Sequence, residues 1–313
     1  MTLALCAVSH SPLFGISDPE AGVLAEVHAA FDTVRAFARS FAPDITIVFG
    51  PDHFNGVFYD MMPAFCIGAG ANSVGDWGTD PGPLPVDRDA AHRLTRAVLK
   101  AGIDTAQSER MQVDHGITQP IEFLFGKGST EPVVPVFINA VGLPLGSMQR
   151  VRLLGEAIGK EAASWGKRVL LVGSGGLSHD PPVPRLQGAS AELAARLIDG
   201  RNPTPEMRAE RQRRVIAAGQ AHAAGDTTFQ QINPEFDGLV LDTLVSGRLA
   251  DADAWSNEWI EEAGGHSAHE IRTWFAAFAA LAVQGRYRVE NRWYWPVREW
   301  MTGFAITTAT EST

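Results

Sequence analysis

Four short apolar runs, each ended by a glycine or by polar residues, constrain most strongly how this chain can fold. Runs of this length without a helical period are typical of strands that are buried on both faces of a sheet. The expected strands are Leu3–Ser9, Asp44–Gly50, Val133–Asn139 and Arg168–Gly173. Because such strands must be covered on both sides, the runs predict a sheet enclosed between layers of helices.

Segments with helical periodicity fill much of the remaining sequence. The expected helices are Pro19 to about Phe41, Asp87–Ala101, Gly116–Phe125, Ser147–Trp165, Ser190–Asp199, Thr204–Ala223, Pro234–Gly247 and Ala268–Gln284. The first should take Asp18 as its N-cap and Pro19 as its first residue. Strands that alternate with helices, followed by a helical C-terminal region, predict one α/β domain over residues 1–313 with a mostly parallel or mixed central sheet. The Gly/Pro-rich stretch 68–85 is expected to be a long functional loop within that domain.

Charge and composition exclude several classes of function. The chain has 26 Lys and Arg against 36 Asp and Glu, a net charge of −10, which argues against non-specific binding to nucleic acid or to an anionic membrane. It has no run of about 18 apolar residues and no basic signal-peptide start, so we expect a cytoplasmic protein. Cys6 and Cys66 lie in apolar runs and are expected to be buried free thiols.

Polar residues follow the expected strands, where ligand sites lie in α/β folds. His10 ends the first strand, His53 follows the second, Asn139 ends the third and His179 follows the fourth. On neighbouring strands, His10 and His53 would meet at one end of the sheet, and neutral imidazole is the commonest metal ligand among side chains. The two are far apart in the sequence, however, and two unrelated loop histidines fit the pattern equally well.

Glu270 is the natural third metal ligand, but its local sequence favours another explanation. Ser267-Ala268-His269-Glu270 matches a capping box, with Ser267 as N-cap and Glu270 at the third helical position. Taken alone, this segment favours a helix cap, and His269 would be a helix-end residue. If Glu270 instead joins His10 and His53, the set becomes the two-histidine, one-carboxylate triad of non-haem Fe(II) oxygenases.

Two further histidines lie in loops that could carry acid–base chemistry. His115 follows Asp114, which is a candidate for orienting its ring, and His179 follows the glycine-rich turn 173–176. Histidine titrates near neutral pH and can therefore give or take a proton. Histidines that only hydrogen-bond locally remain an alternative at both positions. The turn itself matches neither a dinucleotide-binding fingerprint nor a nucleophile elbow.

Four separate motifs, in this order, resemble a known family. They are Ser9-His10-Ser11-Pro12, Gly50-Pro51-Asp52-His53-Phe54-Asn55-Gly56, Gln112-Val113-Asp114-His115-Gly116 and Gly173-Ser174-Gly175-Gly176-Leu177-Ser178-His179. Together with the segment around Glu270, they resemble the class III extradiol ring-cleavage dioxygenases, the superfamily of the catalytic subunit of protocatechuate 4,5-dioxygenase. The resemblance covers nearly the whole chain and is strongest to members that open catechols bearing a propionate side chain.

The resemblance implies a site and a reaction. It implies one α/β domain in which His10, His53 and Glu270 hold Fe(II), and this reverses the local preference for Glu270 as a cap. It also implies that His115 and His179 are the acid–base pair, with His179 as the base that takes the second phenolic proton and His115 as the acid that protonates a departing oxygen. The implied substrates are a catechol and O₂, and the product is a yellow dienoate.

Three other interpretations remain open. A zinc-dependent hydrolase could use the same His10, His53 and Glu270 set, because zinc also accepts nitrogen and oxygen ligands and activates water. A dioxygenase for another catechol or for an aminophenol, or a non-catalytic protein of the same fold, could also have this sequence. A homo-oligomer is expected from the resemblance and from the aromatic C-terminal segment that contains Trp293, Tyr294, Trp295 and Trp300, which should lie in the core or in a subunit interface.

Overall fold

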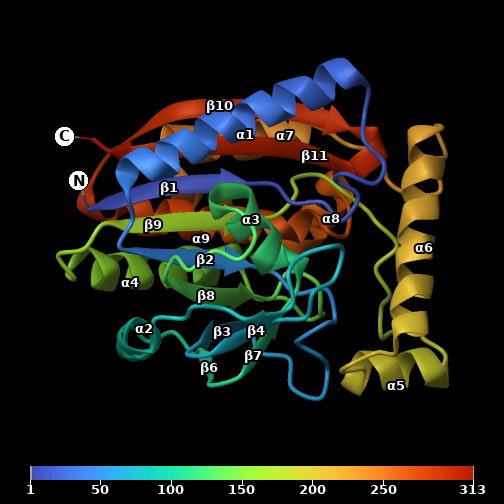
Figure 1. The fold of residues 1–313 in the computed structure, drawn as a ribbon, viewed down its shortest axis with the longest axis horizontal. Helices are drawn as coiled ribbons and strands as arrows, with labels where there is room; N and C mark the ends of the chain where they lie inside the picture. Colours follow the sequence, from blue (N-terminus) through green and yellow to red (C-terminus); the bar gives the residue numbers. More distant parts are fainter. Residues whose placement is uncertain (1, 313) are drawn as a thin grey trace.

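A computed structural model describes residues 2–312, and an eight-stranded mixed sheet runs through the middle of the molecule (Figure 1). The strand order is β10-β11-β1-β9-β2-β8-β3-β6. The strands are β1 (Leu3–Val8), β2 (Ile45–Gly50), β3 (Phe65–Gly68), β6 (Ala106–Ser108), β8 (Val133–Ile138), β9 (Val169–Ser174), β10 (Tyr287–Val297) and β11 (Thr302–Glu311). The four central strands β1, β9, β2 and β8 are parallel to one another. They are the four strands expected from the sequence, and the predicted α/β fold with a mixed sheet is confirmed.

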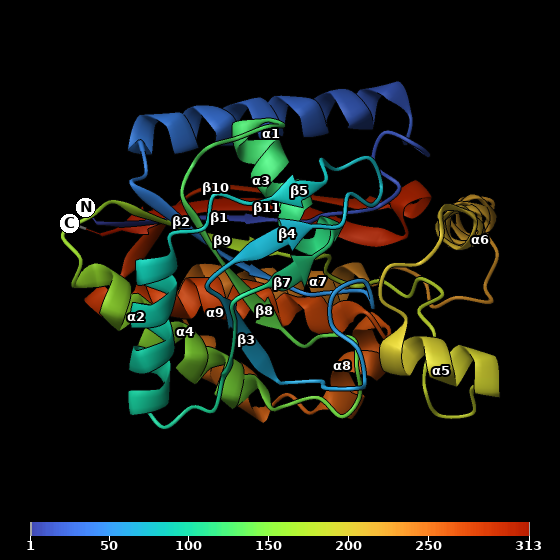
Figure 2. The same ribbon diagram turned by 60° about the horizontal axis from the view of Figure 1, so that its bottom comes forward.

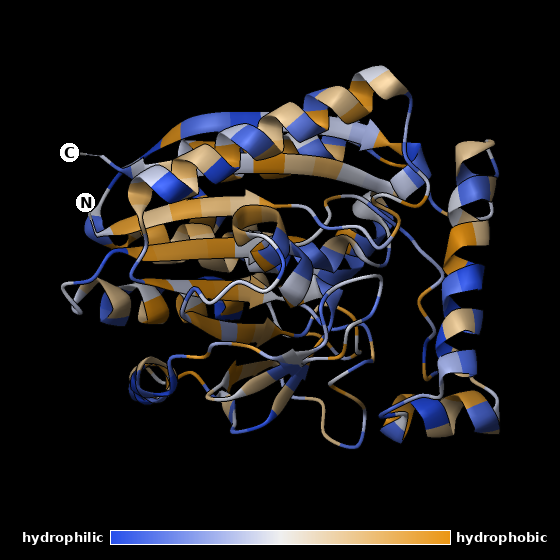
Figure 3. Cartoon of the chain, in the orientation of Figure 1, coloured by the Kyte–Doolittle hydropathy of each residue, from blue (hydrophilic) through white to orange (hydrophobic). Residues whose placement is uncertain are grey.

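Residues of the central strands alternate between two cores, one on each face of the sheet. In β1, Leu3, Leu5 and Ala7 belong to one hydrophobic cluster, whereas Ala4, Cys6 and Val8 belong to the other. Every residue of β1 is buried because helices cover both faces. Figure 3 shows the result as apolar central strands between helices of mixed polarity.

Different helices cover the two faces, as Figure 2 shows. The helices of the main body are α1 (Ala21–Phe41), α2 (Arg88–Lys100), α3 (His115–Phe125), α4 (Met148–Ala163), α7 (Pro234–Ser246), α8 (Asn257–Gly264) and α9 (Ile271–Leu281). Residues of α1 and α3 pack with Cys6 in one core, and residues of α4, α7 and α9 pack with Leu5 in the other. Helix α9 is buried along its whole length, since it lies between the sheet and α4.

The first helix starts later than the sequence suggests. Its N-cap is Glu20, without a side-chain hydrogen bond, and the predicted Asp18–Pro19 start is wrong. Asp18 uses its Oδ1 instead to accept a hydrogen bond from the backbone N–H of Gly15, 2.8 Å away. The Asp18 carboxylate therefore closes the preceding turn and is not available to the helix N–H groups.

The C-terminal region combines the expected helices with two strands that the sequence analysis did not identify. Helical structure between residues 205 and 284 is confirmed, and it is followed by the long hairpin β10–β11, which pairs antiparallel with β1. Short 3₁₀ helices occur at η1 (Leu249–Ala254), η2 (Ala268–Glu270), η3 (Ala282–Gln284) and η4 (Arg298–Trp300). Trp295 and Trp300 are buried in a hydrophobic core, one of the two places expected for these aromatic residues.

Two smaller features complete the fold around one end of the sheet. A three-stranded sheet of β4 (Ala71–Ser73), β5 (Gly82–Pro83) and β7 (Met111–Val113) lies within and beside the expected loop 68–85. Helices α5 (Ala191–Asp199) and α6 (Pro205–Ala223) form an arm that stands beside the carboxyl ends of the central strands (Figure 1). Over residues 2–312, no helix has the length and apolar character needed to cross a bilayer.

Candidate active site

Five ionisable residues singled out from the sequence line one cavity of about 670 Å³. His10 follows β1, His53 follows β2, His115 begins α3 and His179 follows β9, so four segments bring imidazoles to the carboxyl end of the parallel strands. Glu270 ends η2, immediately before α9. The arm α5–α6 and the segment 300–302 line the remainder of the cavity.

The carboxylate of Glu270 lies at the centre of this group. Its Oε1 is 2.9 Å from Nε2 of His53 and 3.4 Å from Nε2 of His179, and its Oε2 is 3.6 Å from Nε2 of His10. The Glu270 side chain is almost completely buried. Three ring nitrogens therefore converge on one buried carboxylate.

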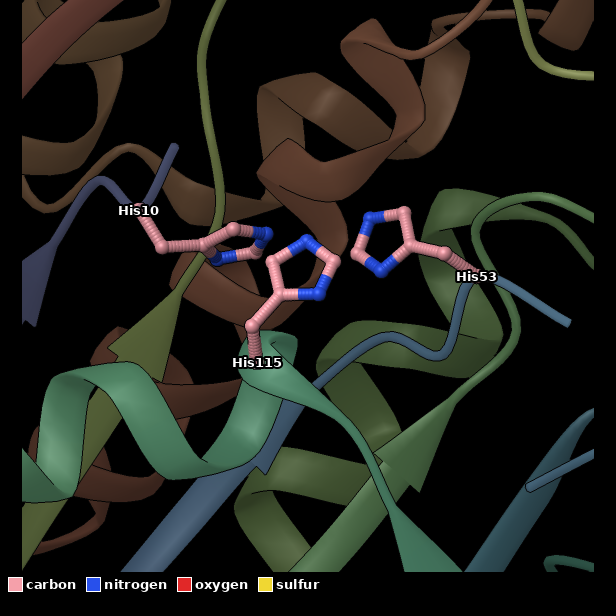
Figure 4. A group of neighbouring side chains, drawn as sticks. All are labelled: His10, His53 and His115. Carbon is pink, nitrogen blue, oxygen red and sulfur yellow. The ribbon is translucent and has the colours of Figure 1, made fainter. Parts of the chain in front are cut away.

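His115 completes a compact cluster of rings with His10 and His53 (Figure 4). The rings of His53 and His115 stack with centroids 4.5 Å apart, and His10 meets both edge to face at 5.4 and 5.3 Å. One ring nitrogen from each lies within 4.8 Å of the others, so these three histidines could also hold a metal ion together. One oxygen atom from each of Asp76 and Asp114 and one ring nitrogen of His115 also lie within 4.8 Å of one another.

Hydrogen bonds to Nδ1 fix the tautomer of these rings. His53 and His115 face the carboxylates of Asp114 and Asp76 at 3.0 and 2.6 Å, and His179 faces the carbonyl oxygen of Leu177 at 2.9 Å. A carboxylate or carbonyl oxygen can only accept, so in all three rings Nδ1 carries the hydrogen and donates it. The neutral rings therefore carry their lone pairs on Nε2.

His10 has the same tautomer, although its partner is a hydroxyl group. Its Nδ1 is 2.9 Å from Oγ of Ser174, and that hydroxyl donates its own hydrogen to the carbonyl oxygen of Gly116, 2.6 Å away. The Ser174 oxygen is therefore free to accept from Nδ1 of His10. Metal-binding histidines usually donate their second ring N–H to such an acceptor, which fixes the ring for its metal.

This donor set fits a divalent cation. A lone pair on Nε2 of His53 and an oxygen of Glu270 cannot approach to 2.9 Å without a proton or a metal ion to hold them. Nitrogen and carboxylate ligands suit Fe(II) and Zn²⁺, and two histidines with one carboxylate leave coordination positions for small molecules. The cluster can thus hold a metal at the inner end of the cavity.

Burial and neighbouring charges shift the titration of the candidate ligands. Burial lowers the pKa of His10 to about 3, so its ring is neutral and can bind a metal. Burial also opposes ionisation of Glu270, but the adjacent His179 and a hydrogen bond from His53 hold the pKa of its carboxyl well below its usual range. Burial opposes protonation of His179 as well, and the Glu270 carboxylate nevertheless raises its pKa.

The structure does not support the helix-cap explanation for Glu270. Ser267 makes no side-chain capping bond, and its backbone N–H donates to the carbonyl oxygen of His179. Oε2 of Glu270 instead accepts from the backbone N–H of Gly176, 2.8 Å away. A Cβ atom at Gly175 would lie 2.6 Å from Cβ of Glu270, so the glycine-rich turn is what allows this close approach.

Asp114 orients a different histidine from the one expected. The sequence suggested it as the partner of His115, but its Oδ2 lies 3.9 Å from Nδ1 of that ring and 3.0 Å from Nδ1 of His53. Oδ2 also accepts from the backbone N–H of His53, and Oδ1 caps α3 through the N–H of Gly116. Adjacent residues at a helix start point apart, which is why sequence neighbourhood misidentified the pair.

Asp76, rather than Asp114, orients the ring of His115, and the sequence analysis did not identify Asp76. Its Oδ2 accepts from Nδ1 of His115, and its Oδ1 accepts from the backbone N–H of His115, 2.9 Å away. Asp76 is buried and lies in the Gly/Pro-rich stretch 68–85. The only signal in the sequence was the length and composition of that loop.

Asp237 is a second residue that sequence reasoning missed. Its buried carboxylate accepts from the backbone N–H and the hydroxyl of Ser178 and from the hydroxyl of Tyr294, all within 2.8 Å. It therefore fixes the turn that precedes His179. Asn139, in contrast, binds backbone groups of its own turn and does not line the cavity.

Comparisons with known proteins agree with the site. Residues 4–305 match the family described as the catalytic LigB subunit of aromatic ring-opening dioxygenase. Proteins named 2,3-dihydroxyphenylpropionate/2,3-dihydroxicinnamic acid 1,2-dioxygenase match at 57% identity from Rhodococcus sp and 55% from Rhodococcus jostii, each over 99% of this chain and 98% of the relative. The protein of that name from Azotobacter vinelandii is 50% identical over 99% of both chains. The resemblance inferred from the motifs is confirmed, and the chain belongs to the LigB family of extradiol aromatic ring-opening dioxygenases.

Proposed function

We propose that this protein uses Fe(II) and O₂ to open the ring of 3-(2,3-dihydroxyphenyl)propionate, and also of 2,3-dihydroxycinnamate, in the catabolism of aromatic compounds. The product is a yellow 2-hydroxy-6-oxo-dienedioate that contains both oxygen atoms of O₂. The observation that carries the proposal is that four histidine rings and one buried carboxylate line the same cavity. The substrates named for relatives that match at 50–57% identity support the choice of catechol.

His10, His53 and Glu270 are the proposed iron ligands. Nδ1 of each histidine is already held by Ser174 or Asp114, and Glu270 receives one backbone N–H bond, so the set is oriented before a metal binds. When bound, Fe(II) would act as a Lewis acid that binds the catechol oxygens, lowers the phenolic pKa and brings O₂ to the ring.

His179 and His115 are the proposed acid–base pair. Nδ1 of His179 donates to Leu177, so its Nε2 lone pair faces the cavity and can take the second phenolic proton. Nδ1 of His115 donates to Asp76, which orients the ring so that Nε2 can deliver a proton to the oxygen that leaves as the ring opens. Each residue should contribute roughly 10²–10⁴-fold to turnover.

A direct assay tests the reaction. The protein is loaded with Fe(II) without air, mixed with 3-(2,3-dihydroxyphenyl)propionate, and then exposed to O₂. We expect a yellow product together with oxygen uptake in equal amount, and loss of both after removal of iron with a chelator. Absence of colour with every catechol, despite bound metal, would contradict the proposal and favour the zinc hydrolase.

Metal content tests the division of roles. Glu270→Ala should lose iron, because it removes the only proposed ligand that carries a negative charge. His115→Gln and His179→Gln should keep iron and lose turnover. Loss of iron from His115→Gln would favour the alternative triad of His10, His53 and His115.

A cytoplasmic homo-oligomer is part of the same proposal. The buried thiols of Cys6 and Cys66 suit a reducing compartment. Light scattering of the purified protein measures the oligomer directly, and a monomeric mass at micromolar concentration would contradict this part.

A further inference from the structure

The cavity joins the histidine cluster to a wall formed by the arm. Its lining includes His10, His53 and Glu270 at the cluster and residues of both α5 and α6 at the wall. In Figures 1 and 2 the arm stands beside the ends of the central strands, where the cluster lies. A catechol bound at the cluster would therefore extend its side chain toward a surface that the arm provides.

Four arginines of the arm line this cavity, and they differ in how their charge is balanced. Arg213 and Arg214 are both paired with Glu210, at 2.5 and 3.0 Å. Arg196 and Arg211 form no salt bridge with any residue between 2 and 312. Arg196 and Arg211 are thus the two arginines of the wall whose charge is not taken up by a direct ion pair within residues 2–312.

Arg211 donates its hydrogen bonds to neutral acceptors. Its guanidinium donates to the carbonyl oxygens of His53 and Phe54 and to Oδ1 of Asn55, so it ties α6 to the loop that carries His53. Arg211 therefore holds the arm against the loop of a proposed iron ligand, and it also lines the cavity.

Arg196 is the arginine of this wall whose donors are not occupied by any protein group within residues 2–312. It is half-buried in α5, it lines the cavity, and its guanidinium makes no hydrogen bond within residues 2–312. The helix around it is held firmly, since Leu197 packs on Phe54 and Phe58 and its carbonyl oxygen accepts from the N–H of Tyr59. A guanidinium in such a position is suited to bidentate binding of a carboxylate.

We propose that Arg196 binds the terminal carboxylate of the substrate side chain, and that Arg211, which lines the same cavity, adds positive charge there. This inference rests on the proposed function and names the group that selects among catechols. The two carboxylates of the wall that are not paired with an arginine of the arm, Glu192 and Glu206, are exposed to water, which screens their repulsion of the bound anion.

Paired substrates test the subsite. We compare 3-(2,3-dihydroxyphenyl)propionate with 3-propylcatechol, which has a side chain of the same length without the carboxylate. Arg196→Met should lower kcat/KM for the acid roughly 10- to 100-fold, mainly through KM, because a charged hydrogen bond is lost. It should leave kcat/KM for 3-propylcatechol within about twofold, since that substrate makes no such bond. Anaerobic binding of the acid, followed by tryptophan fluorescence, should weaken by the same factor.

Two further variants separate a local contact from a general charge effect. Arg213→Met removes the same charge from α6, but its side chain is mostly exposed and already paired with Glu210. It should change kcat/KM for the two substrates equally. Arg196→Glu should reverse the preference and favour 3-(2-aminoethyl)catechol over the acid.

The outcomes are distinct. Equal losses for the acid and for 3-propylcatechol in Arg196→Met, or an equal effect of Arg213→Met on the acid, would overturn the subsite. Cleavage of 3-propylcatechol by every variant shows that each one is folded and active. Failure of the unaltered protein to cleave either catechol would instead overturn the proposed function.

Discussion

At the scale of single residues, the site is organised by the hydrogen-bond acceptor at Nδ1 of each imidazole ring. Ser174, Asp114, Asp76 and the carbonyl of Leu177 each accept the Nδ1 hydrogen of one ring. In His10, His53 and His179 this places the Nε2 lone pair toward the Glu270 carboxylate. The two aspartates hold different rings, so their effects on the enzyme should differ in kind.

Asp114→Asn and Asp76→Asn form a matched pair of substitutions. Asp114 holds His53, a proposed ligand, so its loss should weaken iron binding roughly 10- to 100-fold. Asp76 holds His115, a proposed acid, so its loss should lower kcat roughly 10- to 100-fold and leave iron affinity unchanged. Metal titration followed by steady-state kinetics measures both quantities. Weaker iron binding in Asp76→Asn would identify His115 as a ligand.

The two cysteines should be chemically silent in the folded protein. Burial raises the pKa of Cys66 to about 12 and that of Cys6 still further, so neither forms the reactive thiolate at about pH 8. Ellman's reagent should therefore detect no fast-reacting thiol in the native protein and two thiols after unfolding in urea. A native thiol that reacts within seconds would contradict this prediction.

At the scale of elements, the α4–α9 contact depends on residues without side chains. A Cβ atom added at Gly155 would lie 2.1 Å from the carbonyl oxygen of Ala276, and one at Gly159 would lie 2.2 Å from that of Ala280. The two helices therefore approach backbone to backbone behind the central strands. This contact holds the middle and the end of α9, the helix that directly follows Glu270.

Gly155→Ala should destabilise the protein although alanine is the better helix former. The added methyl group meets fixed backbone, and overpacking of this kind costs about 1–3 kcal/mol of unfolding free energy. Gly238→Ala in α7 is the control, because a Cβ there has open space and should stabilise by up to about 1 kcal/mol. Urea unfolding measures both, and equal signs for the two variants would contradict the packing argument.

Elements with a clear period could be predicted from the sequence, and elements without one could not. The central strands show unbroken apolar runs, and helices such as α2 and α4 show a 3.6-residue period. Strand β10 alternates exposed and partly buried residues, and its sequence predicts only that its aromatic residues lie in the core or in a subunit interface. Its partner β11 pairs in turn with the first strand of the chain, through contacts that lie about 300 residues apart in sequence.

At the scale of the whole molecule, the site is a property of the assembled fold. Its five ionisable residues come from five segments, so their distances could not be read from sequence spacing. Strand order explains why His10 and His53 meet: β1 and β2 both pair with β9 and end at the same edge. Motif resemblance identified the residues, whereas the partners Asp76, Ser174 and Asp237 depend on tertiary contacts alone.

Because the segments are joined only in the native state, metal binding should stabilise the whole fold. A ligand that binds only the native protein adds about 2.7 kcal/mol of stability when it is present at one hundred times its Kd. For a chain of this length, that gain corresponds to roughly 4 °C in Tm. Differential scanning calorimetry without air, with and without Fe(II), measures the shift.

The control for this shift is Glu270→Ala, which should not respond to Fe(II) at the same concentration. The variant also leaves the His53, His179 and His10 rings without the carboxylate that faces them. Like the metal-free protein, it should therefore melt below the iron-loaded enzyme. An equal upward shift in both proteins would mean that iron binds elsewhere. No shift in the unaltered protein, with iron demonstrably bound, would mean that iron binds the unfolded chain as tightly as the native one.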